Sequence, residues 1–79
     1  MIIVTKEKEL INSEYVVKFT KLDSTNENTT CLVATMSNGS EIIVYESNSE
    51  NVSVAMENLI EAFTTTALLI DYSGVKDEH

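Results

Sequence analysis

Apolar and polar residues first alternate in residues 14–20, where three apolar side chains share one face: Tyr15, Val17 and Phe19. This period of two is typical of a half-buried strand. Before it, residues 5–12 carry a weak helical pattern, although residues 1–4 could instead form an edge strand. We therefore expect a short N-terminal helix followed by the first strand.

A hairpin is predicted next, because residues 31–37 and 41–46 are apolar runs separated by Asn38-Gly39. Asn-Gly is the strongest short-range hairpin signal, since a type I′ turn needs positive φ at both central positions. The register that a two-residue turn fixes has four pairs: Ser37 with Ser40, Met36 with Glu41, Ala34 with Ile43 and Leu32 with Tyr45. Both faces of this hairpin are fairly apolar, so we expect the sheet to be covered on both sides.

Residues 50–64 carry the clearest helical pattern, with two distinct faces. At 100° per residue, four apolar side chains lie within about 60° of one another: Val52, Met56, Leu59 and Phe63. Three glutamates lie within about 40° of one another on the opposite side: Glu50, Glu57 and Glu61. Ser47 or Ser49 is the expected N-cap.

The end of the chain leaves one element open. Residues 65–73 combine β-branched residues with a short apolar run, which predicts either a fourth strand or a second short helix. Residues 73–79 are expected to be a frayed tail. The 79 residues make one domain. We expect a two-layer α+β fold in which a three-stranded antiparallel sheet packs against the main helix, with the short N-terminal helix and the C-terminal element added.

The negative charge is concentrated in the middle of the chain. The net charge is -8, yet residues 1–21 carry a net +1, and residues 22–75 hold eight acidic residues and no Lys or Arg. Direct binding to nucleic acid or to an anionic membrane is disfavoured, because both need cationic side chains. A basic protein surface is the favoured partner, since complementary fields speed encounter and select partners.

No residue pattern indicates catalysis, a metal or a cofactor. His79 is the only histidine and the last residue, and the single cysteine, Cys31, is expected to be a small buried side chain rather than a nucleophile. The loop after Asp23 lacks the acidic spacing and central glycine of an EF-hand. We therefore expect no enzyme and no cofactor. A lone cysteine and an N-terminus unlike a signal peptide favour the cytoplasm. We also expect a monomer.

The acidic helix face needs an explanation. Glu57 and Glu61 are an i,i+4 like-charge pair, which destabilises a helix by a few tenths of a kcal/mol. At about 1.5 Å per residue, Glu50 lies roughly 10 Å from Glu57 along the axis, and Glu57 roughly 6 Å from Glu61. These steps are comparable with multiples of the spacing of about 3.4 Å between phosphates on one DNA strand. Three further glutamates on the predicted strands would extend the pattern: Glu14, Glu41 and Glu46. The residues alone leave three alternatives open: a solvated helix face that keeps the protein soluble, an unspecified acidic interaction domain, and mimicry of nucleic acid.

Several segments, taken in order, resemble the acidic phage anti-CRISPR proteins that inhibit the type II RNA-guided CRISPR nuclease. They are EYVVKF at 14–19, Asp23-Ser24, NGSE at 38–41, IIVYES at 42–47 and IEAF at 60–63, within a similarity that covers roughly residues 10–63. The resemblance implies a DNA mimic that blocks the site where the nuclease reads the protospacer-adjacent motif (PAM). Arginines there contact guanines, and carboxylates can offer those arginines bidentate partners instead.

The resemblance also implies which residues meet the partner. The centre would be Asn38, Gly39, Ser40 and Glu41, flanked by Glu14, Glu46 and Glu50. The charge pattern of the helix, and not the resemblance, adds Glu57 and Glu61 as candidate contacts. Asn38 departs from the family pattern, which has an acidic residue immediately before the turn glycine. The family also continues into a further acid-rich helical segment, where this chain has only Asp71, Tyr72, Asp77 and Glu78.

Two other functions fit the same acidic surface. One is an acidic inhibitor or antitoxin of another DNA-binding enzyme, such as a restriction nuclease or a glycosylase. The other is a structural phage protein with an acidic face for assembly. In each case the partner would supply the cations that residues 22–75 lack.

Overall fold

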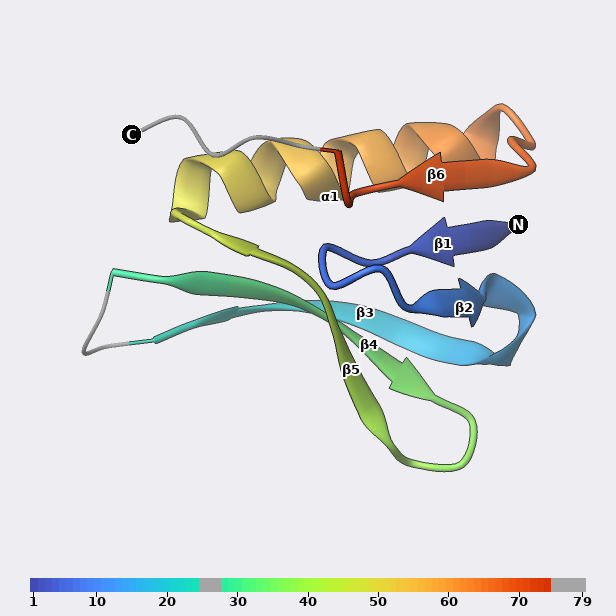
Figure 1. The fold of residues 1–79 in the computed structure, drawn as a ribbon, viewed down its shortest axis with the longest axis horizontal. Helices are drawn as coiled ribbons and strands as arrows, with labels where there is room; N and C mark the ends of the chain where they lie inside the picture. Colours follow the sequence, from blue (N-terminus) through green and yellow to red (C-terminus); the bar gives the residue numbers. More distant parts are fainter. Residues whose placement is uncertain (25–27, 75–79) are drawn as a thin grey trace.

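The computed structural model describes residues 1–24 and 28–74. Its elements in chain order are β1 (Ile2–Val4), β2 (Leu10–Asn12), the 3₁₀ turn η1 (Ser13–Tyr15), β3 (Val16–Asp23), β4 (Thr30–Met36), β5 (Glu41–Ser47), α1 (Ser49–Thr64) and β6 (Leu69–Asp71). They form two three-stranded sheets, in the orders β3-β4-β5 and β2-β1-β6, and one main helix (Figure 1). The α+β class is confirmed, but the prediction of a single sheet is correct only for β3-β4-β5.

The predicted N-terminal helix is wrong, because residues 2–12 form a β-hairpin. β1 pairs antiparallel with β2 and parallel with β6, so residues 1–4 contribute a central strand rather than an edge strand. The buried Thr5 side chain accepts a hydrogen bond from the main-chain N–H of Glu9 at 2.9 Å, and Lys8 has a φ of 66°. A left-handed residue at this point ends any helical path and turns the chain back. The hairpin thereby buries both Ile3 and Ile11.

The element left open at residues 65–73 is a strand. β6 extends the small sheet beside β1, and the tyrosine that follows it is buried against the helix. The Tyr72 hydroxyl donates to the main-chain carbonyl of Ala55 at 2.9 Å, and its ring stacks on Tyr45. The main-chain N–H and the hydroxyl of Ser73 both donate to Asp71 Oδ1, so Ser73 is held in a turn. The rest of the predicted frayed tail, from residue 75, lies outside the described residues.

The hairpin between β4 and β5 exists, but its turn is longer than predicted. The N–H of Gly39 donates to the Met36 carbonyl at 2.9 Å, and the N–H of Met36 donates to the Ser40 carbonyl at 2.7 Å. Within this turn only Gly39 has a positive φ, of 89°. These features define a type I turn followed by a glycine bulge rather than a two-residue type I′ turn.

The longer turn changes the register near the hairpin end. Thr35 pairs with Glu41, and Ala34 pairs with Ile42 rather than with Ile43 as predicted. An irregularity between Leu32 and Val33 then restores the predicted alignment, so that Leu32 faces Tyr45. Because a slip of one residue reverses the side-chain face, Ile43 lies on the side of the sheet opposite to Ala34.

β3 also differs from the simple alternation. Its register with β4 shifts between Val16 and Lys18, and η1 precedes it. Val17 is 69% exposed and Tyr15 60% exposed, whereas Phe19 and Val16 pack against the core. The expected inward face of Tyr15, Val17 and Phe19 is therefore correct only for Phe19.

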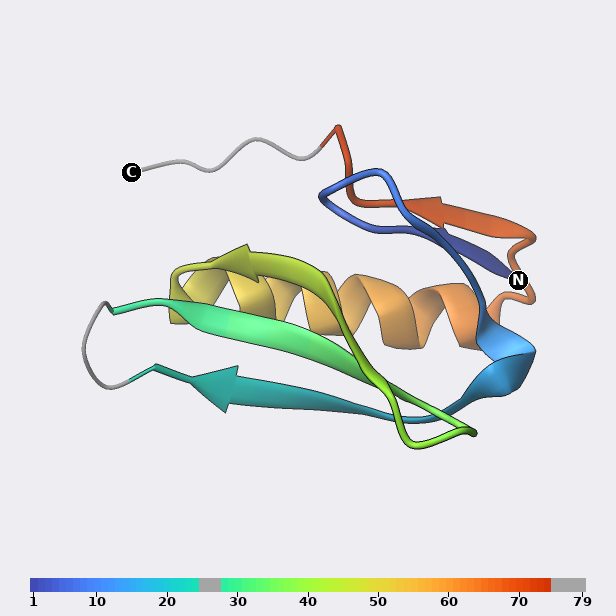
Figure 2. The ribbon, with the colours of Figure 1, turned by 60° about the horizontal axis from the view of Figure 1, so that its bottom comes forward.

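The helix and both sheets share one hydrophobic core. α1 crosses one face of β3-β4-β5, and β6 runs beside the helix (Figures 1 and 2). The buried core residues are Ile3, Ile11, Leu32, Ala34, Val44, Tyr45, Val52, Ala55, Leu59 and Tyr72. Asn48 caps α1 by accepting from the N–H of Asn51 at 2.8 Å, so the predicted caps Ser47 and Ser49 are wrong.

Among residues 1–24 and 28–74, the sheet β3-β4-β5 is covered on one face only, whereas covering of both faces was expected. The N-terminal segment does not shield its second face. That segment reaches only the edge of β5, where the N–H of Lys6 donates to the Val44 carbonyl at 2.8 Å. Leu22 and Ile43 consequently remain 49% exposed on this face, which we call the open face.

Candidate protein-binding surface

The hairpin end and η1 bring five of the predicted binding residues together. The N–H of Ser37 donates to the Tyr15 carbonyl at 2.7 Å, which fixes the hairpin end beside the turn that carries Glu14. η1 is itself held by Asn12, whose side chain accepts from the N–H of Glu14 at 3.0 Å. All five residues in this group are exposed: Glu14, Asn38, Gly39, Ser40 and Glu41.

The polar side chains at the hairpin end, which we also call the tip, hold the turn between β4 and β5 in place. Asn38 Oδ1 accepts from the N–H of Ser40 at 2.9 Å and from the Ser40 hydroxyl at 2.7 Å. This local bonding explains why Asn38 suits the position although it carries no charge. The tip is therefore pre-ordered before any partner binds, and a pre-ordered surface loses less entropy on binding.

Glu41 and Glu46 lie on the open face, near opposite ends of β5. Glu41 pairs with Thr35 and Glu46 with Cys31, so all four side chains point away from the helix. The Cys31 thiol donates to Glu46 Oε2 at 3.2 Å. Burial raises the pKa of Cys31, and the carboxylate of Glu46 adds to this effect. Cys31 is thus a partly buried thiol on the open face rather than a fully buried side chain.

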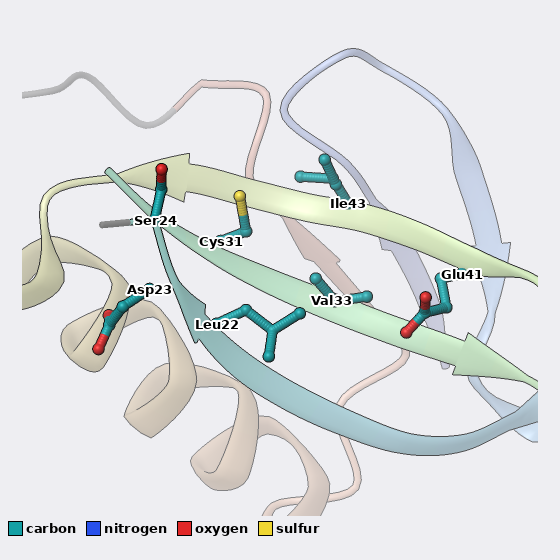
Figure 3. Close-up of a pocket in the computed structure, with 7 residues that line it drawn as sticks. All are labelled: Leu22, Asp23, Ser24, Cys31, Val33, Glu41 and Ile43. Atoms are coloured by element: carbon teal, nitrogen blue, oxygen red, sulfur yellow. The ribbon is translucent and has the colours of Figure 1, made fainter. Parts of the chain in front are cut away.

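An apolar hollow lies on the open face between these carboxylates. Its volume is about 410 Å³, and its lining residues come from β3, β4 and β5 and from the residue after β3: Leu22, Asp23, Ser24, Cys31, Val33, Glu41 and Ile43 (Figure 3). Sequence reasoning missed this hollow. The residue pattern ended the first strand at residue 20, before Leu22, and both faces of the sheet were expected to be covered, so no exposed hollow was expected beside Glu41.

The helix glutamates lie on the other side of the molecule. Glu50, Glu57 and Glu61 are exposed, as the helical pattern predicts. However, α1 packs on the inner face of β3-β4-β5, so its outer surface points away from the open face. The carboxylates expected to form one array therefore fall into two groups. The hairpin and open-face group holds Glu14, Glu41 and Glu46, and the helix group holds Glu50, Glu57 and Glu61. One flat partner surface cannot cover both groups.

Few cationic side chains of the described residues balance the negative charge of these carboxylates. Within residues 1–24 and 28–74, no salt bridge forms at Glu14, Glu41, Glu46 or the three helix glutamates. Lys21 Nζ instead donates to the Ser53 hydroxyl at 2.7 Å, and Lys6 Nζ donates to the main-chain carbonyl of Glu46 at 2.8 Å. An acidic surface that is unpaired in this way attracts a cationic partner.

The described residues hold no cluster of three or more Cys, His, Asp or Glu side chains that could bind a metal ion. None of their helices is long and apolar enough to cross a membrane. Comparisons of the chain with known protein families, with curated proteins and with solved structures found no match.

Proposed function

We propose that this protein inhibits an RNA-guided CRISPR nuclease by occupying the site at which the nuclease reads the PAM duplex. The observation that carries the proposal is the ordered hairpin end, where the exposed Glu41 lies in the same group as Glu14 and neither forms a salt bridge in the described chain. The resemblance of residues 10–63 to acidic phage anti-CRISPR proteins supports the same target.

The mechanism follows from the chemistry of PAM reading. Such nucleases contact guanines through arginine side chains that form two parallel hydrogen bonds. A carboxylate offers a guanidinium the same bidentate geometry with a full opposite charge. Glu41 and Glu14 would take these contacts, while Asn38 and Ser40 hold the turn in shape. Neither a cofactor nor catalysis is required.

The two groups of carboxylates take different roles in this proposal. The hairpin and open-face group would contact the nuclease, with Glu46 at its far end. The helix group would act at longer range, because Glu50, Glu57 and Glu61 add to the negative field that steers a basic partner. We therefore expect strong effects from substitutions in the first group and weaker, salt-dependent effects from substitutions in the second.

A matched pair of charge reversals tests this assignment. Glu41→Lys and Glu61→Lys change the net charge equally, and both positions are exposed. Losing one partner of a buried charge pair costs about 2–5 kcal/mol at an interface, so Glu41→Lys should weaken inhibition of target cleavage at least about thirty-fold. Glu61→Lys should weaken it only a few-fold. Equal effects of the two variants would remove the hairpin from the contact site.

An inhibitor of another DNA-binding enzyme is the second candidate. It is favoured by β6 of the small sheet β2-β1-β6, because β6 is a strand in the region where the resemblance implies a further helical segment. Parallel assays with a restriction nuclease and with a DNA glycosylase distinguish this function, since inhibition of either enzyme in place of the CRISPR nuclease would support it.

A further inference from the structure

The hollow on the open face combines an apolar floor with a carboxylate at its rim. Val33, only 5% exposed, forms the floor on the central strand, and Leu22 and Ile43 form walls on the two flanking strands. Figure 3 shows the Glu41 side chain at the end nearest the hairpin, beside Val33. Ser24 lines the hollow at the other end.

Such a combination selects a particular kind of ligand. A purely apolar group would leave the Glu41 carboxylate desolvated without a partner, and a small inorganic cation would gain nothing from Leu22, Val33 and Ile43. An amphipathic cation satisfies both parts, because long cationic side chains pack their methylene stems on apolar surface and keep their charge at a polar edge.

We infer that the hollow binds an arginine side chain of the partner protein, with its methylenes between Leu22 and Ile43 and its guanidinium at Glu41. The partner being a basic protein surface rests on the proposed function. Arginine is preferred to lysine because its planar fork can make two hydrogen bonds to one carboxylate and is more weakly hydrated than an ammonium group.

Two lysines of the described residues lie near this face, and they do not occupy the hollow. Lys18 lies two strands away from Glu41, since Lys18 pairs with Thr35 and Thr35 pairs with Glu41. Lys6 lies beyond Ile43, where it contacts Glu46 and the Tyr45 ring. Neither lysine lines the hollow.

Part of the binding energy then comes from apolar side chains and not only from the glutamates. Burying the arginine stem adds affinity that salt does not screen, whereas contacts at the exposed tip weaken as ionic strength rises. The complex should therefore retain part of its affinity at high salt, and that part should depend on Ile43 and Leu22.

A titration with a side-chain analogue tests the hollow without any nuclease. The probes are butylguanidinium, butylammonium and guanidinium, added to the full chain at constant ionic strength, with methyl chemical shifts recorded by NMR. Butylguanidinium should give saturable shifts at Leu22, Val33 and Ile43, binding at least about five-fold more tightly than guanidinium. It should also bind more tightly than butylammonium. Ile60, 57% exposed on the helix, provides the control methyls and should show no saturable shift.

Variants separate this inference from the proposed function. Ile43→Ser and Leu22→Ser shorten the walls at half-exposed positions, and Ile60→Ser removes a similar apolar surface from the helix. Both wall variants should weaken inhibition of the nuclease at least about ten-fold, with Ile60→Ser unchanged. Circular dichroism and thermal unfolding verify that each variant is folded.

The outcomes are distinct. Absence of saturable butylguanidinium shifts at the hollow, or equal affinity for guanidinium alone, overturns the inference even if the protein inhibits the nuclease. Saturable shifts without any inhibition uphold the hollow as an arginine site and refute the proposed target. Inhibition that is unchanged in both wall variants overturns the role of the hollow in the complex.

Discussion

The hydroxyl of Tyr72 should contribute measurably to stability, because it fastens the C-terminal strand to the helix. The side chain is 2% exposed, and its hydroxyl donates to the Ala55 carbonyl at 2.9 Å. Tyr72→Phe removes this hydrogen bond and keeps the ring, which stacks on Tyr45 at 5.8 Å. Ala55 lies within α1, so its carbonyl keeps its intrahelical donor. The net loss should be about 1 kcal/mol, or a decrease in Tm of roughly 4–8 °C at pH 7.

The same substitution should change the response to alkaline pH. Burial raises the pKa of Tyr72 above the value of 10.0 expected for an exposed tyrosine, because the phenolate would lose its hydration. The stability that neutral Tyr72 contributes is fully present below pH 10. Above pH 10 the unfolded chain ionises while the folded one does not, so this stability falls by up to about 1.4 kcal/mol per pH unit until the folded pKa is reached. The Tyr72→Phe variant has no group to ionise here and does not lose this stability. The original protein loses about 1 kcal/mol of its free energy of unfolding by about pH 10.7, so the two proteins should be equally stable there. Above that pH the variant should be the more stable of the two.

Urea unfolding followed by circular dichroism between pH 7 and 11.5 measures both effects. Tyr15→Phe is the matched control, because Tyr15 is 60% exposed and the change should stay within about 0.5 kcal/mol. If Tyr72→Phe were no more destabilising than Tyr15→Phe at pH 7, the hydroxyl would not anchor β6. A difference that stayed constant up to pH 11.5 would refute the buried, neutral Tyr72.

Two further predictions concern the scaffold of the binding surface. The Thr35 hydroxyl oxygen is buried with no hydrogen-bond partner among the described residues, so Thr35→Val should raise the free energy of unfolding by about 1 kcal/mol in urea; a decrease would show that the hydroxyl has a partner. Asn48→Ala should lower the free energy of unfolding by about 1 kcal/mol, because the side chain that accepts the hydrogen bond from the Asn51 N–H at the start of α1 is lost. Ser49→Ala is its control, and equal losses from both would contradict the assignment of Asn48 as the cap.

The helix and the main hairpin were predictable because their signals are local. The apolar positions of α1 recur at helical spacing over four turns, and Asn38-Gly39 marks the reversal between β4 and β5. The small sheet was not predictable in this way. Its parallel pair joins Ile2–Val4 to Leu69–Asp71, two three-residue strands near opposite ends of the described chain. Such short strands have no period of their own, and only the fold brings them together.

The exposure of the glutamates could be predicted from the sequence, but their arrangement on the surface could not. Exposed glutamates follow from the pattern, yet the packing of α1 against one face of the sheet separates the helix glutamates from Glu41. The hollow depends on the register shifts beside Val17 and after Leu32, which decide which side chains reach the open face. Bulges of this kind alter the face of every later residue in a strand without a clear sequence signal.

The order in which inhibitor and target DNA meet the nuclease tests the central claim most directly. A guide-loaded type II nuclease is mixed with this protein before or after a PAM-containing duplex, and the bound fraction of DNA is measured under conditions of slow DNA release. A protein that occupies the PAM-reading site should abolish DNA binding when added first and leave a preformed complex intact when added second. Equal inhibition in both orders, or inhibition of cleavage without any loss of DNA binding, would contradict the account.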